Sequence, residues 1–155
     1  FSWGVHNITS IQWSNTKIQA GFESLRENYG WEIYETLSGK QGGLENKFSE
    51  KRTPLSVFLN AQYRFAEQAV IEAGLSLNTL KYSLTDKHND SINLSGDYSY
   101  AMVASPFVGF NVQLWPGGRL YGSVSHGFSA PSVEETLLPE GSINPNLKPE
   151  TGFFK

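Results

Sequence analysis

The chain has 155 residues, and its 12 lysines and arginines against 15 aspartates and glutamates give a net charge of −3. A slightly acidic chain without a long basic run lacks the electrostatic footprint of a nucleic-acid-binding protein, so we expect no nucleic-acid partner. The absence of cysteine excludes disulfides and thiolate metal sites, and no apolar run approaches the roughly 20 residues of a membrane helix.

The first third of the chain predicts two strands and a loop. Residues 3–13 alternate apolar and polar side chains, which is the period of a strand with two different faces. A tight turn at 14–16 leads into a second strand over 18–34, in which Gly30 predicts a bend or a bulge. Residues 38–53 are rich in glycine and charge and poor in apolar side chains, so they predict a long solvated loop.

The middle of the chain contains the clearest strand, over residues 57–65. Its apolar face consists of Val57, Leu59, Ala61, Tyr63 and Phe65, and its other face of Phe58, Asn60, Gln62 and Arg64. A short turn at 66–68 leads into a fourth strand, whose apolar face consists of Ile71, Ala73, Leu75 and Leu77. Residues 86–99 then predict a second polar loop.

The last third predicts two more strands and a third long loop. A fifth strand over 108–114 turns at 115–118 into a sixth strand over 120–125. Residues 129–151 follow as a loop that contains Pro131, Pro139, Pro145 and Pro149. Because proline lacks the N–H that a ladder needs and disfavours helix before it, this stretch cannot form a central strand or a long helix.

The predicted connections alternate strictly between short and long. An antiparallel meander with all its long loops at one end is the layout of an outer-membrane barrel, so the sequence predicts an all-β, up-and-down meander that is a segment of a transmembrane β-barrel. The short-turn ends carry aromatic side chains where an interfacial girdle would lie, namely Trp13, Tyr63, Phe65 and Trp115. The polar face is mostly small and uncharged, which suits a lumen filled by a plug; it consists of Ser56, Asn60, Gln62, Gly74, Ser76, Asn78, Gly109, Asn111 and Gln113.

Two linked motifs near the C-terminus give a family resemblance. The first is a strand motif formed by Leu120, Tyr121, Ser123, Ser125, Gly127, Phe128, Ala130 and Pro131. The second closes the following loop and is formed by Asn144, Pro145, Leu147, Lys148, Pro149, Glu150 and Gly152. In this order they resemble the C-terminal half of the barrel of TonB-dependent outer-membrane receptors. His126 lies where many members carry arginine or lysine.

The resemblance implies a role in uptake. Residues 1–155 would form part of such a barrel, with about six strands and the start of a seventh, and the plug domain would be absent from this chain. The implied function is TonB-dependent transport of a bulky nutrient across the outer membrane of a Gram-negative bacterium. A ferric siderophore is the expected ligand, because the motifs look like those of the iron-receptor branch. The expected partners are this ligand, TonB through the missing N-terminal region, and outer-membrane lipid.

The resemblance also places the ligand site in the extracellular loops. Aromatic and apolar loop residues are the candidates for ligand contact, and we expect them to be Phe128, Tyr98, Tyr100 and Leu137. His6, His88 and His126 lie in different elements without metal-ligand spacing, so no metal site is predicted. No catalytic residues and no cofactor are predicted, and the protein is not expected to be an enzyme.

Two other functions remain open from the sequence. The first is a secreted or surface β-sandwich that binds glycans by stacking sugars on exposed tryptophan and tyrosine. The second is a hydrolase built on an outer-membrane barrel. A signal peptide, a TonB-binding segment and a plug domain in the parent gene would distinguish the receptor from both.

Overall fold

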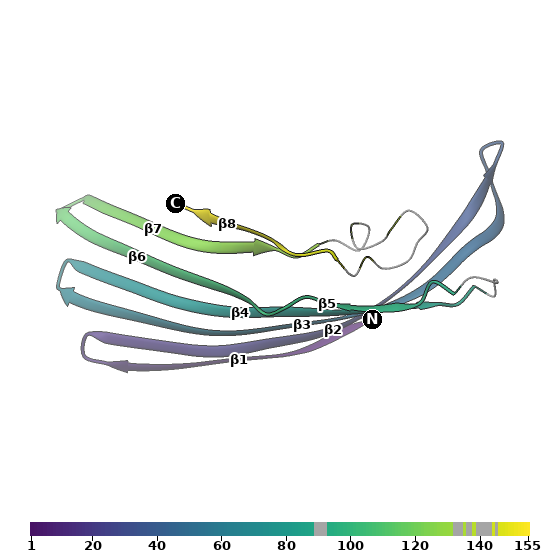
Figure 1. The fold of residues 1–155 in the computed structure, drawn as a ribbon. Coiled ribbons are helices and arrows are strands. Elements are labelled where there is room, and N and C mark those ends of the chain that lie inside the picture. The colour runs from purple at the N-terminus through teal and green to yellow at the C-terminus, as the bar shows by residue number, and fades with distance from the viewer. Residues whose placement is uncertain (89–92, 132–134, 136–137, 139–143, 145) are drawn as a thin grey trace.

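A computed structural model of the chain describes residues 1–88, 93–131, 135, 138, 144 and 146–155. These residues form one curved, open β-sheet (Figure 1). Its strands are β1 (Ser2–Trp13), β2 (Thr16–Leu37), β3 (Lys40–Ala66), β4 (Ala69–Asp86), β5 (Gly96–Ser99), β6 (Val103–Trp115), β7 (Gly118–Ser129) and β8 (Glu150–Phe154).

The strands are neighbours in the order of the sequence, and every pair is antiparallel. β5 and β6 both pair with β4, β5 along Lys81–Leu84 and β6 along Ala69–Asn78. Together they therefore occupy a single strand position in the sheet, with a break between them. The predicted all-β antiparallel meander is therefore confirmed. A β-sandwich needs two sheets packed face to face, and the described strands form a single sheet, so the glycan-binding sandwich loses its structural basis.

The two faces of the sheet differ as the alternation predicts. Leu59 of β3 lies between Ala20 of β2 and Leu75 of β4, whereas the next residue, Asn60, lies between Gln19 and Gly74. The face of Leu59, here called the apolar face, exposes large hydrophobic side chains to the surroundings, among them Phe22, Val57, Leu59, Tyr63, Ile71, Leu75, Val108 and Phe110. The face of Asn60 is called the polar face. Because side chains alternate along a strand, each strand contributes to both.

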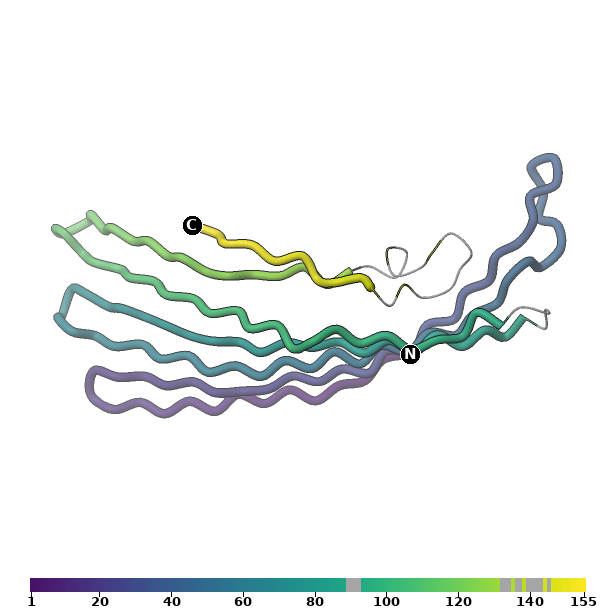
Figure 2. The backbone as a smooth tube through the Cα atoms, in the orientation of Figure 1, coloured from purple at the N-terminus to yellow at the C-terminus, as the bar shows by residue number. Residues whose placement is uncertain are grey.

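The connections differ between the two ends of the sheet (Figure 2). At one end, the short-turn end, two residues join the strands in each turn, at 14–15, 67–68 and 116–117. At the other end, the loop end, lie the turn at 38–39 and the connections 87–95 and 130–149. The four predicted girdle residues Trp13, Tyr63, Phe65 and Trp115 are all exposed at the short-turn end.

The predicted loop over 38–53 is wrong. β2 and β3 continue as a long hairpin and turn only at Ser38 and Gly39, which both have positive φ, at 51° and 77°. Cross-strand contacts replace the missing apolar pattern, because the rings of Trp31 and Phe48 lie 4.4 Å apart and Lys47 forms a 2.7 Å ion pair with Glu32. Paired side chains of this kind stabilise a ladder without a continuous apolar face.

Two smaller predictions also need correction. The polar loop predicted over 86–99 is shorter, because β4 includes Asp86 and Gly96–Ser99 form β5. Gly30 does not form a bulge, since it pairs in register with Ser49; the shifts of register occur on either side of Tyr34. In both regions the backbone keeps its ladder where composition indicated a break.

The side on which apolar residues lie changes partway along three neighbouring strands. In β4 Ile71, Ala73, Leu75 and Leu77 lie on the apolar face, whereas Leu80, Tyr82 and Leu84 lie on the polar face and are buried. β3 changes between Leu55 and Phe48, and β2 changes between Phe22 and Tyr29. Below this level most of the large apolar side chains are exposed. Above it Phe48, Leu80, Tyr82 and Leu84 are buried, whereas Tyr29 and Ile33 of β2 remain exposed. No helix in the described part of the chain has the length and hydropathy to cross a membrane.

Candidate functional site

A cluster of buried hydrophobic residues lies on the polar face at the loop end and is here called the tyrosine cluster. It consists of Leu80, Tyr82, Tyr98 and Tyr100, whose exposed fractions are all 8% or less. Val103, Phe128 and Leu147 pack against it from β6, β7 and the connection before β8. Tyr82 and Tyr98 face each other because β4 and β5 pair there, and their rings lie 6.1 Å apart.

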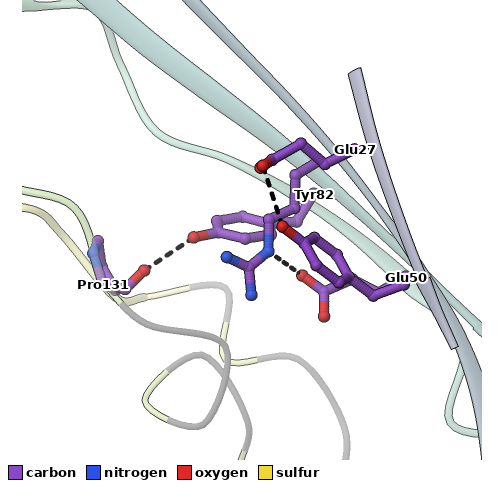
Figure 3. Close-up of polar contacts among 6 residues, drawn as sticks. Glu27, Glu50, Tyr82 and Pro131 are labelled. Atoms are coloured by element: carbon purple, nitrogen blue, oxygen red, sulfur yellow. Dashed lines mark hydrogen bonds and ion pairs between the residues drawn. The ribbon is translucent and has the colours of Figure 1, made fainter. Parts of the chain in front are cut away.

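Tyrosine hydroxyls attach the connection between β7 and β8 to the sheet. The Tyr82 hydroxyl donates to the carbonyl of Pro131 at 2.8 Å, as Figure 3 shows, and the Tyr98 hydroxyl donates to the carbonyl of Leu147. Pro131 and Leu147 belong to the two motifs that bracket this connection. The cluster therefore holds both described ends of the proline-rich segment over the polar face.

An arginine lies beside the cluster between two aromatic rings. The Arg52 guanidinium is 5.0 Å from the centre of the Tyr29 ring and 5.4 Å from that of Tyr82, which is cation–π distance. Its Nε donates to the buried Glu50 carboxylate at 2.5 Å, and the Tyr29 hydroxyl donates to Glu27 at 3.0 Å (Figure 3). Cross-strand pairing explains the grouping, because Glu27, Arg52 and Tyr82 occupy one row of the sheet.

Burial sets the protonation of the cluster. Loss of water around the ring, above all, raises the pKa of Tyr82 from 10.0 to about 12. Burial also raises the pKa of the Tyr98 and Tyr100 hydroxyls. All three hydroxyls therefore stay protonated, so those of Tyr82 and Tyr98 remain hydrogen-bond donors near neutral pH. The side chain of Arg52 is 26% exposed, so the site offers a cation on an aromatic support with partial access to solvent.

The structure brings three of the four predicted ligand residues together. Tyr98 and Tyr100 lie inside the tyrosine cluster, and Phe128 packs on it with its ring 6.3 Å from that of Tyr100. Leu137 lies outside the described residues. Sequence reasoning missed Tyr82, Arg52 and Glu50. The signal that could have found them is the alternation of Phe48, Glu50 and Arg52, which continues the strand where composition predicted a loop.

The histidines do not form a metal site in the described residues, where no group of three metal-ligating side chains occurs. His126 has a structural contact instead, because its Nδ1 lies 3.1 Å from the carbonyl oxygen of Ala104 in β6. The ladder between β6 and β7 ends at Phe107 and Ser125, next to Pro106, which has no N–H to continue it. The imidazole thus bridges two strands beyond the end of their ladder.

Comparison with known protein families gives one result that covers nearly the whole chain. The family model described as "TonB dependent receptor-like, beta-barrel" matches residues 3–153. Comparison with curated proteins finds no match. The matched region contains β2 to β7 in full, all but one residue of β1 and of β8, and both ends of the connection that the tyrosine cluster holds.

Proposed function

The chain belongs to the TonB-dependent receptor β-barrel family, and from this premise we propose that it serves the uptake of a ferric siderophore. Proteins of this family lie in the outer membrane of Gram-negative bacteria and transport ligands without catalysing a reaction. The predicted outer-membrane location and the absence of enzymatic activity are therefore confirmed by family membership. The hydrolase hypothesis is set aside on the same ground.

The observation that supports a siderophore is the pair of motifs at the end of the chain. Residues 127–131 read GFSAP and residues 143–150 read INPNLKPE, and both are similar to the iron-receptor branch of the family. The tyrosine cluster holds residues from both motifs, Pro131 and Leu147, so their shared function is consistent with a single loop-end site.

The chemistry beside the cluster suits an anionic iron chelate. The terminal nitrogens of Arg52 form no hydrogen bond within the described residues, because only its Nε is engaged by Glu50. A guanidinium held between two rings is pre-organised for a carboxylate, a catecholate or a hydroxamate oxygen. We therefore propose Arg52 as a ligand-binding residue on the inner side of the barrel wall.

The ligand residues expected from the sequence keep a place in this proposal. Phe128, at the end of β7, and Leu137, in the connection between β7 and β8, are proposed to contact the ligand. Tyr98 and Tyr100 are almost fully buried, so we propose that they shape the site by supporting Phe128 and Leu147 rather than through their own hydroxyls.

We propose that the chain supplies part of the wall of a larger receptor. Plugged transporters of this kind have about 22 strands, more than the described sheet contains. The remaining wall, the plug and the segment that binds TonB would belong to other parts of the receptor. Energy would reach the ligand site through the plug.

Deletion of the parent gene tests the proposed ligand. We expect the deletion strain to lose growth and radioactive iron uptake when iron is offered only as one ferric siderophore. Restoring the gene should restore uptake, and the Arg52→Gln variant should restore it with a weaker apparent affinity. Arg64→Gln is the matched control, because Arg64 lies on the polar face at the short-turn end. If the deletion strain takes up every ferric chelate normally but loses uptake of another nutrient, such as cobalamin, the siderophore assignment is wrong.

A further inference from the structure

A shallow depression of about 410 Å³ lies on the apolar face just above the level where apolar side chains change sides. Here it is called the lysine depression. It is lined by Tyr82 and Tyr98, whose side chains lie on the polar face, and by six polar residues, Lys51, Thr53, Lys81, Ser83, Asp97 and Ser99. Continuous pairing places the six polar residues on the same face as Leu55, Val57 and Leu77. These six side chains therefore lie on the outer face of the barrel wall, opposite to the side chains of Tyr82 and Tyr98.

The side chains of the depression form a regular array. Lys51 pairs with Ser83, which pairs with Asp97, and in the adjacent row Thr53 pairs with Lys81, which pairs with Ser99. Lys51 and Lys81 are thus diagonal neighbours, which lie about 7 to 8 Å apart in a sheet. Neither lysine forms an ion pair within the described residues. Two ammonium groups and one carboxylate give the site a net positive charge, with hydroxyl groups beside each lysine.

The position of the two lysines relative to the membrane determines which part of a lipid can contact them. Below the depression the apolar face carries Leu55 and Val57, which are 37% and 45% exposed and suit acyl chains. The connections at this end are the long ones, which in outer-membrane barrels lie outside the cell. The lysines therefore lie where the apolar band gives way to the headgroups of the outer leaflet.

We propose that the lysine depression binds the phosphate group of an outer-leaflet glycolipid. A phosphate between Lys51 and Lys81 would accept hydrogen bonds from both ammonium groups and from the neighbouring hydroxyls, while the acyl chains lie along Leu55 and Val57. Asp97 opposes the anion and limits the affinity. This inference rests on the outer-membrane location of the family and not on the ligand that the receptor transports.

Native mass spectrometry of the full-length receptor, titrated in detergent with diphosphorylated lipid A, tests the proposal. Each of Lys51→Gln and Lys81→Gln should weaken binding about fivefold, as expected for one lysine near an anionic lipid headgroup. The Lys17→Gln/Lys40→Gln double variant is the control for charge, because Lys17 lies on the polar face and Lys40 beside the hairpin turn. It should bind as the unmodified receptor does. Equal binding by Lys51→Gln/Lys81→Gln and the control would overturn the proposal.

Three further arms separate the possible sources of binding. Lipid A without its phosphates should bind weakly to the unmodified receptor. Its affinity should equal that of phosphorylated lipid A for the Lys51→Gln/Lys81→Gln variant. If removal of the phosphates left the affinity for the unmodified receptor unchanged, phosphate recognition would be contradicted. Inorganic phosphate alone should not displace the lipid, since full displacement would indicate a free-anion site. Asp97→Asn should tighten binding, and weakening would contradict direct contact between ammonium and phosphate. Iron uptake is not measured, so failure here is distinguishable from failure of the siderophore assignment.

Discussion

Tyr82 links the sheet to the β7–β8 connection through one buried hydroxyl. Because burial raises its folded pKa from 10.0 to about 12, the stabilising contribution of the protonated hydroxyl is complete below pH 10 and is lost as the pH rises towards 12. We expect the tyrosinate absorbance of this residue to appear near the upper limit of that interval. A difference titration between the receptor and its Tyr82→Phe variant measures it. If Tyr82 ionised at the same pH as the exposed tyrosines, the claim that burial raises its pKa would be contradicted.

Removal of the same hydroxyl tests the contact at neutral pH. Tyr82→Phe keeps the ring but leaves the carbonyl of Pro131 without its donor, which should cost about 1 kcal/mol of local stability. We expect faster protease cleavage within residues 131–149, measured by mass spectrometry of the fragments. Tyr121→Phe is the control, because that side chain is 80% exposed. Equal cleavage rates in the two variants would show that the Tyr82 hydroxyl does not hold the segment.

The residues of the site were only partly accessible to sequence reasoning. Tyr98, Tyr100 and Phe128 could be named because aromatic residues are conspicuous near predicted loops. Arg52 could not, because the charge and glycine around it indicated a loop and hid the strand alternation. The grouping of Arg52 with Tyr82 depends on the register between β3 and β4, which no local pattern specifies.

At the scale of the strand, the strongest sequence signal is the change of the apolar side along β2, β3 and β4. Below the level of this change, the outward-facing positions of the strands are apolar because they contact lipid. Above it, the apolar residues are at inward-facing positions, because the outer face of the barrel wall there contacts water. The sequence analysis named the apolar face of the fourth strand only as far as Leu77, and so did not identify the change that follows before Leu80. A strand search that allows the apolar phase to switch would have continued it to Leu84.

The extended hairpin of β2 and β3 depends on aromatic contact in place of a continuous apolar face. Trp31→Ala removes the ring that packs against the buried Phe48, and such pairs contribute about 0.5 to 1.5 kcal/mol beyond their burial. We expect faster amide hydrogen exchange in residues 34–47. Leu37→Ala is the control, because Leu37 is 54% exposed near the turn. Unchanged exchange in Trp31→Ala would mean that the ladder alone maintains the hairpin.

The alternation within β3 predicts opposite tolerance at adjacent positions. Leu59 is on the apolar face and Asn60 on the polar face. In the full-length receptor, Leu59→Arg should cost about 2 to 4 kcal/mol if the residue lies near the bilayer midplane, whereas Asn60→Arg should cost much less. Folding into lipid vesicles at increasing denaturant measures both. Equal costs would refute the assignment of the two faces.

For the whole molecule, the order of the strands followed from the sequence, but the extent of the sheet did not. The short turns that follow Trp13 and Trp115 predicted antiparallel neighbouring strands, because a connection of two residues can join only antiparallel strands. The length of β2 and β3 was underestimated, since strand length beyond the membrane depends on cross-strand contacts rather than on composition.

The isolated chain should not remain monomeric in water. Its described sheet has open edges at β1 and β8 and exposes Leu59, Leu75 and many other large apolar side chains. Exposed edges and apolar patches of this kind promote association. We expect light scattering from dilute chain in detergent-free buffer to show self-association, and detergent to reverse it. A stable monomer with Leu59 still exposed would argue against selection of this face for lipid.

The central claim is that odd-numbered residues of β3 between 55 and 63 face lipid and even-numbered residues face the lumen. Single cysteines placed from 55 to 62, labelled with a fluorophore in a full-length receptor from which any other cysteine has been removed, test this directly; the chain itself contains no cysteine. We predict that a lipid-attached quencher acts on labels at 55, 57, 59 and 61, and that labels at 56, 58, 60 and 62 escape it. Quenching that does not alternate, or that alternates with the opposite phase, would contradict the placement of this chain in the barrel wall.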